Sequence, residues 1–140
     1  MTGTMRLLVL TTEPVSADQI REALPDGARP EEAEVMVVAP ALHRDALHFW
    51  MSDADDAIAN AERVRRETVE RLDQQGVAAS GDTGESDPVE AIQDSLQSFP
   101  ADRIVLFTHP ESDRRYKEDL DPQEIRERFG IPVDHALVSG

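Results

Sequence analysis

A short apolar run in the last third of the chain constrains the fold most strongly. Residues 101–110 read ADRIVLFTHP, so four consecutive apolar residues end abruptly at Thr108, His109 and Pro110. A run this short, with β-branched and aromatic members, is typical of a strand buried on both faces in a parallel sheet. Ligands of such sheets bind just beyond the carboxyl ends of the strands. The run therefore predicts both an architecture and a candidate crevice.

The rest of the chain alternates between strand-like and helix-like segments. Apolar runs predict further strands at 5–11, 35–39, 77–80 and 132–138, the third of these being weak. Capping signals and helical spacing predict helices at 16–24 and 53–75 and helix starts at 87 and 121. The glycine-containing segment 81–86 is predicted as a turn. With right-handed crossovers, this order predicts an α/β three-layer sandwich with a five-stranded parallel sheet and helices on both faces.

Composition narrows the class of protein. The 140 residues predict one domain, 1–140, and the absence of cysteine excludes disulfides and thiolate chemistry. The 29 acidic and 14 basic residues give a net charge of -15, which disfavours nucleic acid and anionic membranes as partners. No apolar run is long enough to span a membrane, and the first residues lack the layout of a signal peptide. We expect a cytoplasmic protein.

The predicted crevice lies beyond the carboxyl ends of the predicted parallel strands. Its threonines could donate hydrogen bonds, and His109 could pair with a phosphate or act as an acid or base. Alternatively, these side chains only cap strand ends and turns. No catalytic residue is assigned. The lining residues are Thr11, Thr12, Glu13, Thr108, His109 and Pro110, with Ala39 and Pro40 beside them.

Arg114, Arg115 and Lys117 form the one basic cluster of an acidic chain. Guanidinium groups there could bind an anion. The interspersed acidic residues favour local salt bridges on a solvated loop instead; they are Glu111, Asp113, Glu118 and Asp119.

Residues 43–56 suggest two further features. His43, His48 and three aspartates match no compact metal-ligand spacing, and Asp53, Asp55 and Asp56 are explained as favourable charges at a helix N-terminus, so no metal is predicted. Three large apolar residues could form a lid over the crevice or fill the core or a dimer seam. They are Leu47, Phe49 and Trp50.

A set of motifs in a fixed order resembles the universal stress protein family. The motifs are APAL at 39–42, SDAD at 52–55, GD at 81–82, DPVEAI at 87–92, ADRIV at 101–105, THP at 108–110 and FGIPVDH at 129–135. The resemblance spans nearly the whole chain. It implies a Rossmann-like, adenine nucleotide alpha hydrolase-like fold with strand order 3-2-1-4-5. It also implies a stress-related or regulatory role in the cytoplasm and dimerisation through the last strand, here 133–138, whose outer edge would present unpaired backbone groups.

The chain departs from the family in the loop that would wrap the phosphates of ATP. Members that bind nucleotide carry Gly-x2-Gly-x9-Gly-Ser/Thr after the fourth strand, whereas residues 108–120 contain no glycine. Only glycine readily leaves the backbone open to a phosphate. We therefore expect a non-enzymatic, Usp-like binding module that does not hold ATP or AMP in the usual manner. The alternatives are a nucleotide-binding protein with weak hydrolase or transferase activity at Thr11, Thr108 and His109, and a pure interaction subunit.

Overall fold

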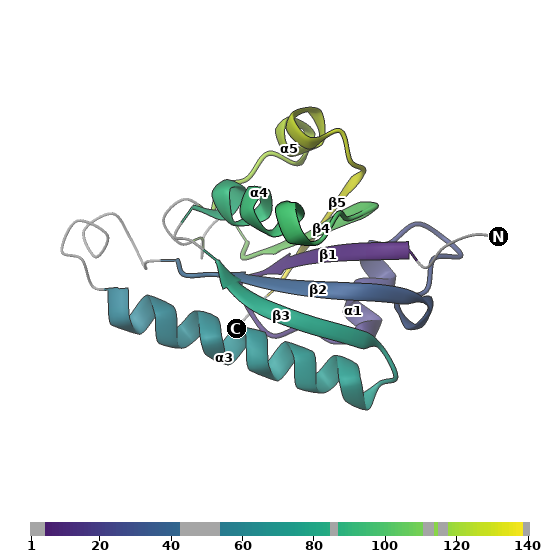
Figure 1. Ribbon diagram of the computed structural model, residues 1–140, viewed down its shortest axis with the longest axis horizontal. Helices are drawn as coiled ribbons and strands as arrows, with labels where there is room; N and C mark the ends of the chain where they lie inside the picture. The colour runs from purple at the N-terminus through teal and green to yellow at the C-terminus, as the bar shows by residue number, and fades with distance from the viewer. Residues whose placement is uncertain (1–4, 43–53, 85–86, 111–113, 115–117, 139–140) are drawn as a thin grey trace.

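Five parallel strands form one sheet in the order β3-β2-β1-β4-β5, as predicted (Figure 1). The computed structural model describes residues 5–42, 54–84, 87–110, 114 and 118–138. The strands are β1 (Met5–Thr11), β2 (Ala33–Pro40), β3 (Ala78–Gly84), β4 (Arg103–Thr108) and β5 (Val133–Leu137). The α/β class and the strand order that the universal stress protein resemblance implied are both confirmed.

The described α-helices begin within one residue of their predicted starts. They are α1 (Ala17–Ala23), α3 (Ala54–Gln74), α4 (Pro88–Ser98) and α5 (Pro122–Phe129), with a short 3-10 turn η1 (Pro30–Glu32). Ser16 and Gln19 form a reciprocal capping box at α1. The Asp87 and Asp121 side chains accept backbone N–H groups at the starts of α4 and α5, each ahead of a proline. Gly130 ends α5 in the left-handed conformation, with φ 66°.

Helices cover both faces of the sheet. Along β1, Leu7 and Val9 belong to one apolar cluster, which includes side chains of α1 and α3, whereas Leu8 and Leu10 belong to the other, which includes side chains of α4 and α5. Figure 1 shows α3 running along one side of the sheet and α4 and α5 on the opposite side. The same alternation holds along β4, so β1 and β4 are both buried on both faces, as their apolar runs predicted.

The prediction for residues 81–86 was wrong over its first four positions, because 81–84 continue β3 and pair with β2. Close packing explains the glycines there. A Cβ atom on Gly84 would lie 2.5 Å from the Cβ of Ala91 on α4, and one on Gly81 would lie 2.7 Å from the Arg65 side chain on α3. Glycine in this strand therefore marks close helix approach rather than a turn.

The chain diverges after β1 and β4, and this divergence positions the site. Thr11 at the end of β1 pairs with Phe107 near the end of β4. After β1 the chain leads to α1 on one face, and after β4 it leads to α5 on the other. A crevice is expected where two neighbouring parallel strands send their connections to opposite faces. Among the described residues, no helix is long and apolar enough to cross a membrane.

Candidate functional site

A buried histidine lies between two buried glutamates at the ends of β1 and β4. His109 Nε2 is 2.7 Å from Glu13 Oε2, and His109 Nδ1 is 2.9 Å from both carboxylate oxygens of Glu118. The exposed fractions are 5% for His109, 8% for Glu13 and 0% for Glu118. We call these three residues the Glu13–His109–Glu118 cluster. It lies at the predicted crevice and places three of the chain's own side chains there.

The geometry requires His109 to be an imidazolium when both glutamates are ionised. A neutral imidazole has one N–H donor and one acceptor nitrogen, so it can donate to only one of two carboxylates. Here both ring nitrogens face carboxylate oxygens at hydrogen-bond distance. The charged ring donates on both sides and neutralises part of the buried negative charge.

The Glu118 carboxylate collects further donors. Its Oε2 atom accepts the backbone N–H of His109 and lies 3.1 Å from Thr12 Oγ1. Sequence reasoning placed Glu118 among the charges of a solvated loop, and this was wrong. A fully buried carboxylate is expected to be paired and hydrogen-bonded, and the His109 ring, the His109 amide and Thr12 meet that requirement. No periodic pattern marked Glu118, because it lies outside any helix or strand.

Glu13 connects the cluster to α3. Arg63 Nη2 lies 3.8 Å from Glu13 Oε1, and Arg63 also pairs with Glu67 and Asn60 along the helix. Arg63 is half-exposed and supplies a positive charge at the edge of the cluster. Sequence reasoning missed it, since a charged residue on the solvent side of a long helix carries no signal of a distant partner.

Three of the other predicted site residues also lie close to the cluster. Thr12 contributes its hydroxyl to Glu118, and the Thr11 hydroxyl donates to the carbonyl oxygen of Glu13. Arg114 Nε donates to the carbonyl oxygen of His109 at 3.3 Å, while its Nη1 pairs with Asp119. Arg114 thus makes the local salt bridge that the alternating charges favoured. Its described contacts are with the His109 carbonyl oxygen and with Asp119, and not with the ring or the carboxylates of the cluster.

The remaining predicted residues lie apart from these contacts. The Thr108 hydroxyl is 2.7 Å from His135 Nε2, so its hydrogen bond is to β5. Ala39 packs against Ala61 and Val64 of α3, and Pro40 is buried at the end of β2. Arg115 lies outside the described residues.

Several residues for which the sequence suggested a role lie outside the described part of the chain. In the segment 43–56 they are His43, Leu47, His48, Phe49, Trp50 and Asp53. Lys117 of the basic cluster lies outside it as well. Asp55 and Asp56 do lie in the first turn of α3, where they were expected. Within the part of the chain that the structure describes, no group of three or more His, Cys, Asp or Glu side chains is arranged so that it could hold a metal ion.

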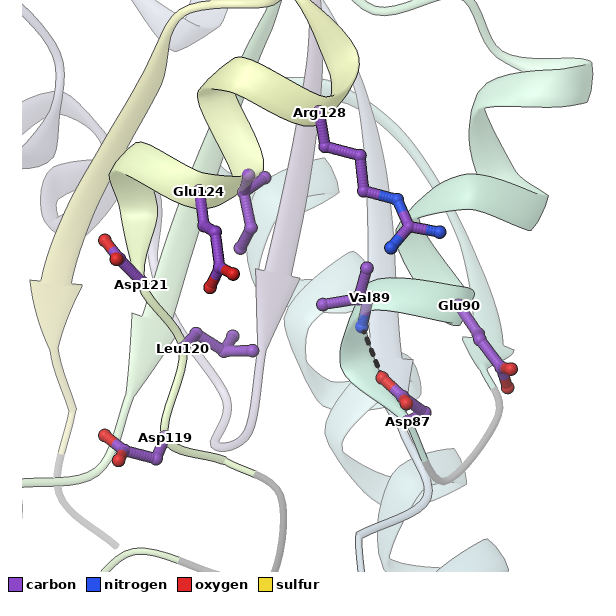
Figure 2. A pocket seen from close by; sticks show the side chains of 9 residues that line it. Asp87, Val89, Glu90, Asp119, Leu120, Asp121, Glu124 and Arg128 are labelled. Carbon is purple, nitrogen blue, oxygen red and sulfur yellow. Dashed lines mark hydrogen bonds between the residues drawn. The ribbon is translucent and has the colours of Figure 1, made fainter.

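A separate cavity of about 430 Å³ opens between α4 and α5 (Figure 2). Val89, Leu120 and Ile125 form its apolar part, and Arg128 reaches from α5 to Gln93 on α4. The carboxylates that line it would repel a phosphate or nucleotide. They belong to Asp87, Glu90, Asp119, Asp121 and Glu124.

The pKa values of two histidines shift in opposite directions. Burial works to lower the pKa of His109, but hydrogen bonds to Glu118 and Glu13 and the charges of both glutamates outweigh it and raise the pKa above 6.5. Burial, helped by the charge of Arg114, lowers the pKa of His135. The folded state thus holds the His109 proton more tightly than the unfolded chain does, and the His135 proton less tightly.

These shifts predict opposite pH dependences of stability. The stabilisation due to His109 is fully present below pH 6.5, its ordinary pKa, and is lost as the pH rises through the raised value. We expect the difference in unfolding free energy between the wild type and His109→Gln to shrink between pH 6.5 and the alkaline range. Urea denaturation at a series of pH values measures it.

His135→Asn is the matched control for that titration. Because the pKa of His135 is lowered, its stabilisation is present above pH 6.5 and is lost as the pH falls. The two differences should therefore change with opposite slopes. A His109 difference that stays constant with pH would contradict a proton held in the cluster.

The cluster leaves His109 no free ring nitrogen. Both nitrogens are engaged by carboxylates, so the ring can give or accept a proton at an outside molecule only after one of these contacts breaks. In its observed state the site holds buried charged side chains and connects the segment after β1, the segment after β4 and the segment before α5. It presents neither a free base nor a free acid on His109.

The fold and site define an α/β domain of the doubly wound, parallel-sheet class with a buried Glu–His–Glu cluster at the ends of β1 and β4. Among solved structures, the chain is similar to hypothetical protein MJ0577, whose structure served for the assignment of its biochemical function. The likeness covers 98% of both chains, with a TM-score of 0.62 and 12% sequence identity, and it shows a shared fold. No family model and no curated protein matches the sequence.

Proposed function

We propose that this chain is a Usp-like, non-enzymatic regulatory module that has lost the usual ATP binding of that family and acts through protein association. The observation that carries the proposal is the Glu13–His109–Glu118 cluster. Two buried carboxylates occupy the crevice at the β1–β4 divergence, where a nucleotide would bring further negative charge. The glycine-free segment 108–120 and the strand order 3-2-1-4-5 support the same function.

We expect ATP and AMP to leave the melting temperature of the wild type unchanged relative to salt at equal ionic strength. A ligand present at about 100 times its Kd stabilises a folded protein by about 2.7 kcal/mol. That is a shift of several degrees in a domain of this size. Differential scanning fluorimetry with millimolar ATP, AMP and phosphate measures it, and release of labelled phosphate tests for turnover. A shift with ATP that disappears in His109→Ala, or measurable turnover, would contradict the proposal.

The association that we propose is a homodimer through the outer edge of β5 and residue 138. Within the described sheet β5 pairs only with β4, so its other edge presents backbone groups for a second copy. Leu137 on this strand is 58% exposed. A large apolar side chain on an open strand edge favours pairing with another chain.

Leu137→Asp is expected to convert this dimer into a monomer, because an aspartate would bring two like charges into the shared edge. Multi-angle light scattering at micromolar concentration measures the mass. Ile58→Asp is the matched control, since Ile58 on α3 is 49% exposed and lies away from the edge strand. A monomeric wild type would count against the dimer, as would equal loss of mass in both variants.

A further inference from the structure

Three hydrogen-bond donors converge on the Glu118 carboxylate. The His109 amide, the His109 ring N–H and the Thr12 hydroxyl come from the ends of two neighbouring strands, and all three meet the carboxylate of Glu118. Each is buried. Converging buried donors of this kind, one of them cationic, are what a protein uses to hold a carboxylate or phosphate group.

The donors lie on the residues that directly follow the two strands, Thr12 after β1 and His109 after β4, whereas the carboxylate comes from the segment that precedes α5. Residue 118 is nine positions after His109 and outside the regular elements. The site therefore consists of a framework that the sheet supplies and an occupant that the following segment supplies. These two parts can be separated by substitution at position 118 alone.

The charge balance favours a replacement anion when the occupant is removed. Without Glu118, the His109 ring keeps Glu13 as its partner, and Glu13 keeps Arg63 at 3.8 Å. The freed His109 amide and ring Nδ1 would then be buried donors that have lost their carboxylate acceptor, which is unfavourable. The Thr12 hydroxyl would keep the Phe107 carbonyl oxygen, 3.4 Å away, as its acceptor. An anion of suitable size restores both the hydrogen bonds and the charge.

We propose that the β1–β4 crevice is a binding site for a small oxyanion, and that the Glu118 carboxylate is its internal occupant. A free carboxylate or phosphate takes the same position only when this side chain is absent. The inference goes beyond the proposed function, because it assigns a ligand class to the crevice and names the residue that keeps such ligands out.

Chemical rescue of Glu118→Ala tests the proposal. This substitution removes the equivalent of one acetate ion, and it is expected to lower the melting temperature. Sodium formate, acetate or phosphate should then raise the melting temperature of the variant by roughly 4 °C at about tenfold the Kd of the anion, compared with sodium chloride at equal ionic strength. The formate, acetate and phosphate arms distinguish a carboxylate-sized site from one that takes phosphate.

Asp119→Ala is the matched control, because it removes the neighbouring exposed carboxylate that pairs with Arg114 and not with His109. Neither this variant nor the wild type should respond to the three anions beyond the chloride reference. Adding Thr12→Val to Glu118→Ala removes one donor and should reduce the rescue. Equal responses in wild type, Asp119→Ala and Glu118→Ala would overturn the proposal.

Glu118→Gln keeps the test decisive if Glu118→Ala does not fold. Glutamine has the same shape without the charge, so this variant should melt below the wild type and should not respond to the anions. Wild-type stability in Glu118→Gln would show that a neutral occupant serves equally and would overturn the proposal. Binding of ATP by the wild type would contradict the proposed function, and rescue of Glu118→Ala is measured independently of it.

Discussion

Replacing His109 with alanine is expected to lower the free energy of unfolding at neutral pH by about 3–5 kcal/mol, the range found when one partner of a buried ion pair is removed. The substitution leaves the Glu13 and Glu118 carboxylates buried within one crevice without the cation between them. Domains of ordinary stability unfold with only about 5–15 kcal/mol. The variant should therefore be much closer to unfolding. Urea denaturation followed by circular dichroism measures the change.

His135→Ala is the matched control on the neighbouring strand. His135 also makes a short side-chain hydrogen bond, 2.7 Å to Thr108, but it contacts no carboxylate among the described residues and is partly exposed. Its loss should cost about 1 kcal/mol, the usual net worth of one hydrogen bond. Similar losses in the two variants would show that the Glu13–His109–Glu118 cluster is no more than a pair of ordinary hydrogen bonds.

Leu106→Ala and Phe107→Ala are expected to destabilise the protein by about 2–5 and 3–5 kcal/mol respectively, the costs of truncating buried side chains of these types. The two residues are neighbours on β4, yet Leu106 packs in the cluster with α4 and α5, and Phe107 packs in the cluster with α1 and α3. Two consecutive large losses are the signature of a strand covered on both faces. The same denaturation experiment measures both.

Ile58→Ala on α3 provides the reference for an apolar side chain that is 49% exposed, and it should change the stability by no more than about 0.5 kcal/mol. A small effect at either Leu106 or Phe107 would show that one face of β4 is less well covered than the structure indicates.

The strands and helix starts could be predicted because their signals are local. The apolar runs of β1 and β4 fix two buried strands, and aspartate followed by proline fixes the starts of α4 and α5. The continuation of β3 over 81–84 could not be predicted in this way. Gly81 and Gly84 allow α3 and α4 to pack closely against this strand. Glycine is also typical of turns, so the composition of 81–84 does not distinguish a turn from a strand that helices approach closely.

The residues of the candidate site could likewise be predicted only in part. Thr12, Glu13 and His109 could be placed together because parallel strands end at one edge of a sheet, so the strand order alone brings them close. Glu118 and Arg63 could not, since each reaches the cluster by a side-chain contact that no repeat or spacing encodes. Thr108 was placed at the correct strand end, and its hydrogen bond to β5 depends on side-chain direction.

The central place of β1 in the sheet has a consequence for biosynthesis. Leu7 pairs with Val35 on one side and with Arg103 on the other, so one neighbour follows within 28 positions and the other only after 96. A ribosome therefore releases β1, β2 and β3 well before β4, and until then one long edge of β1 has no native neighbour. Pairings this distant slow folding and lengthen the time during which an open strand edge can meet another nascent chain.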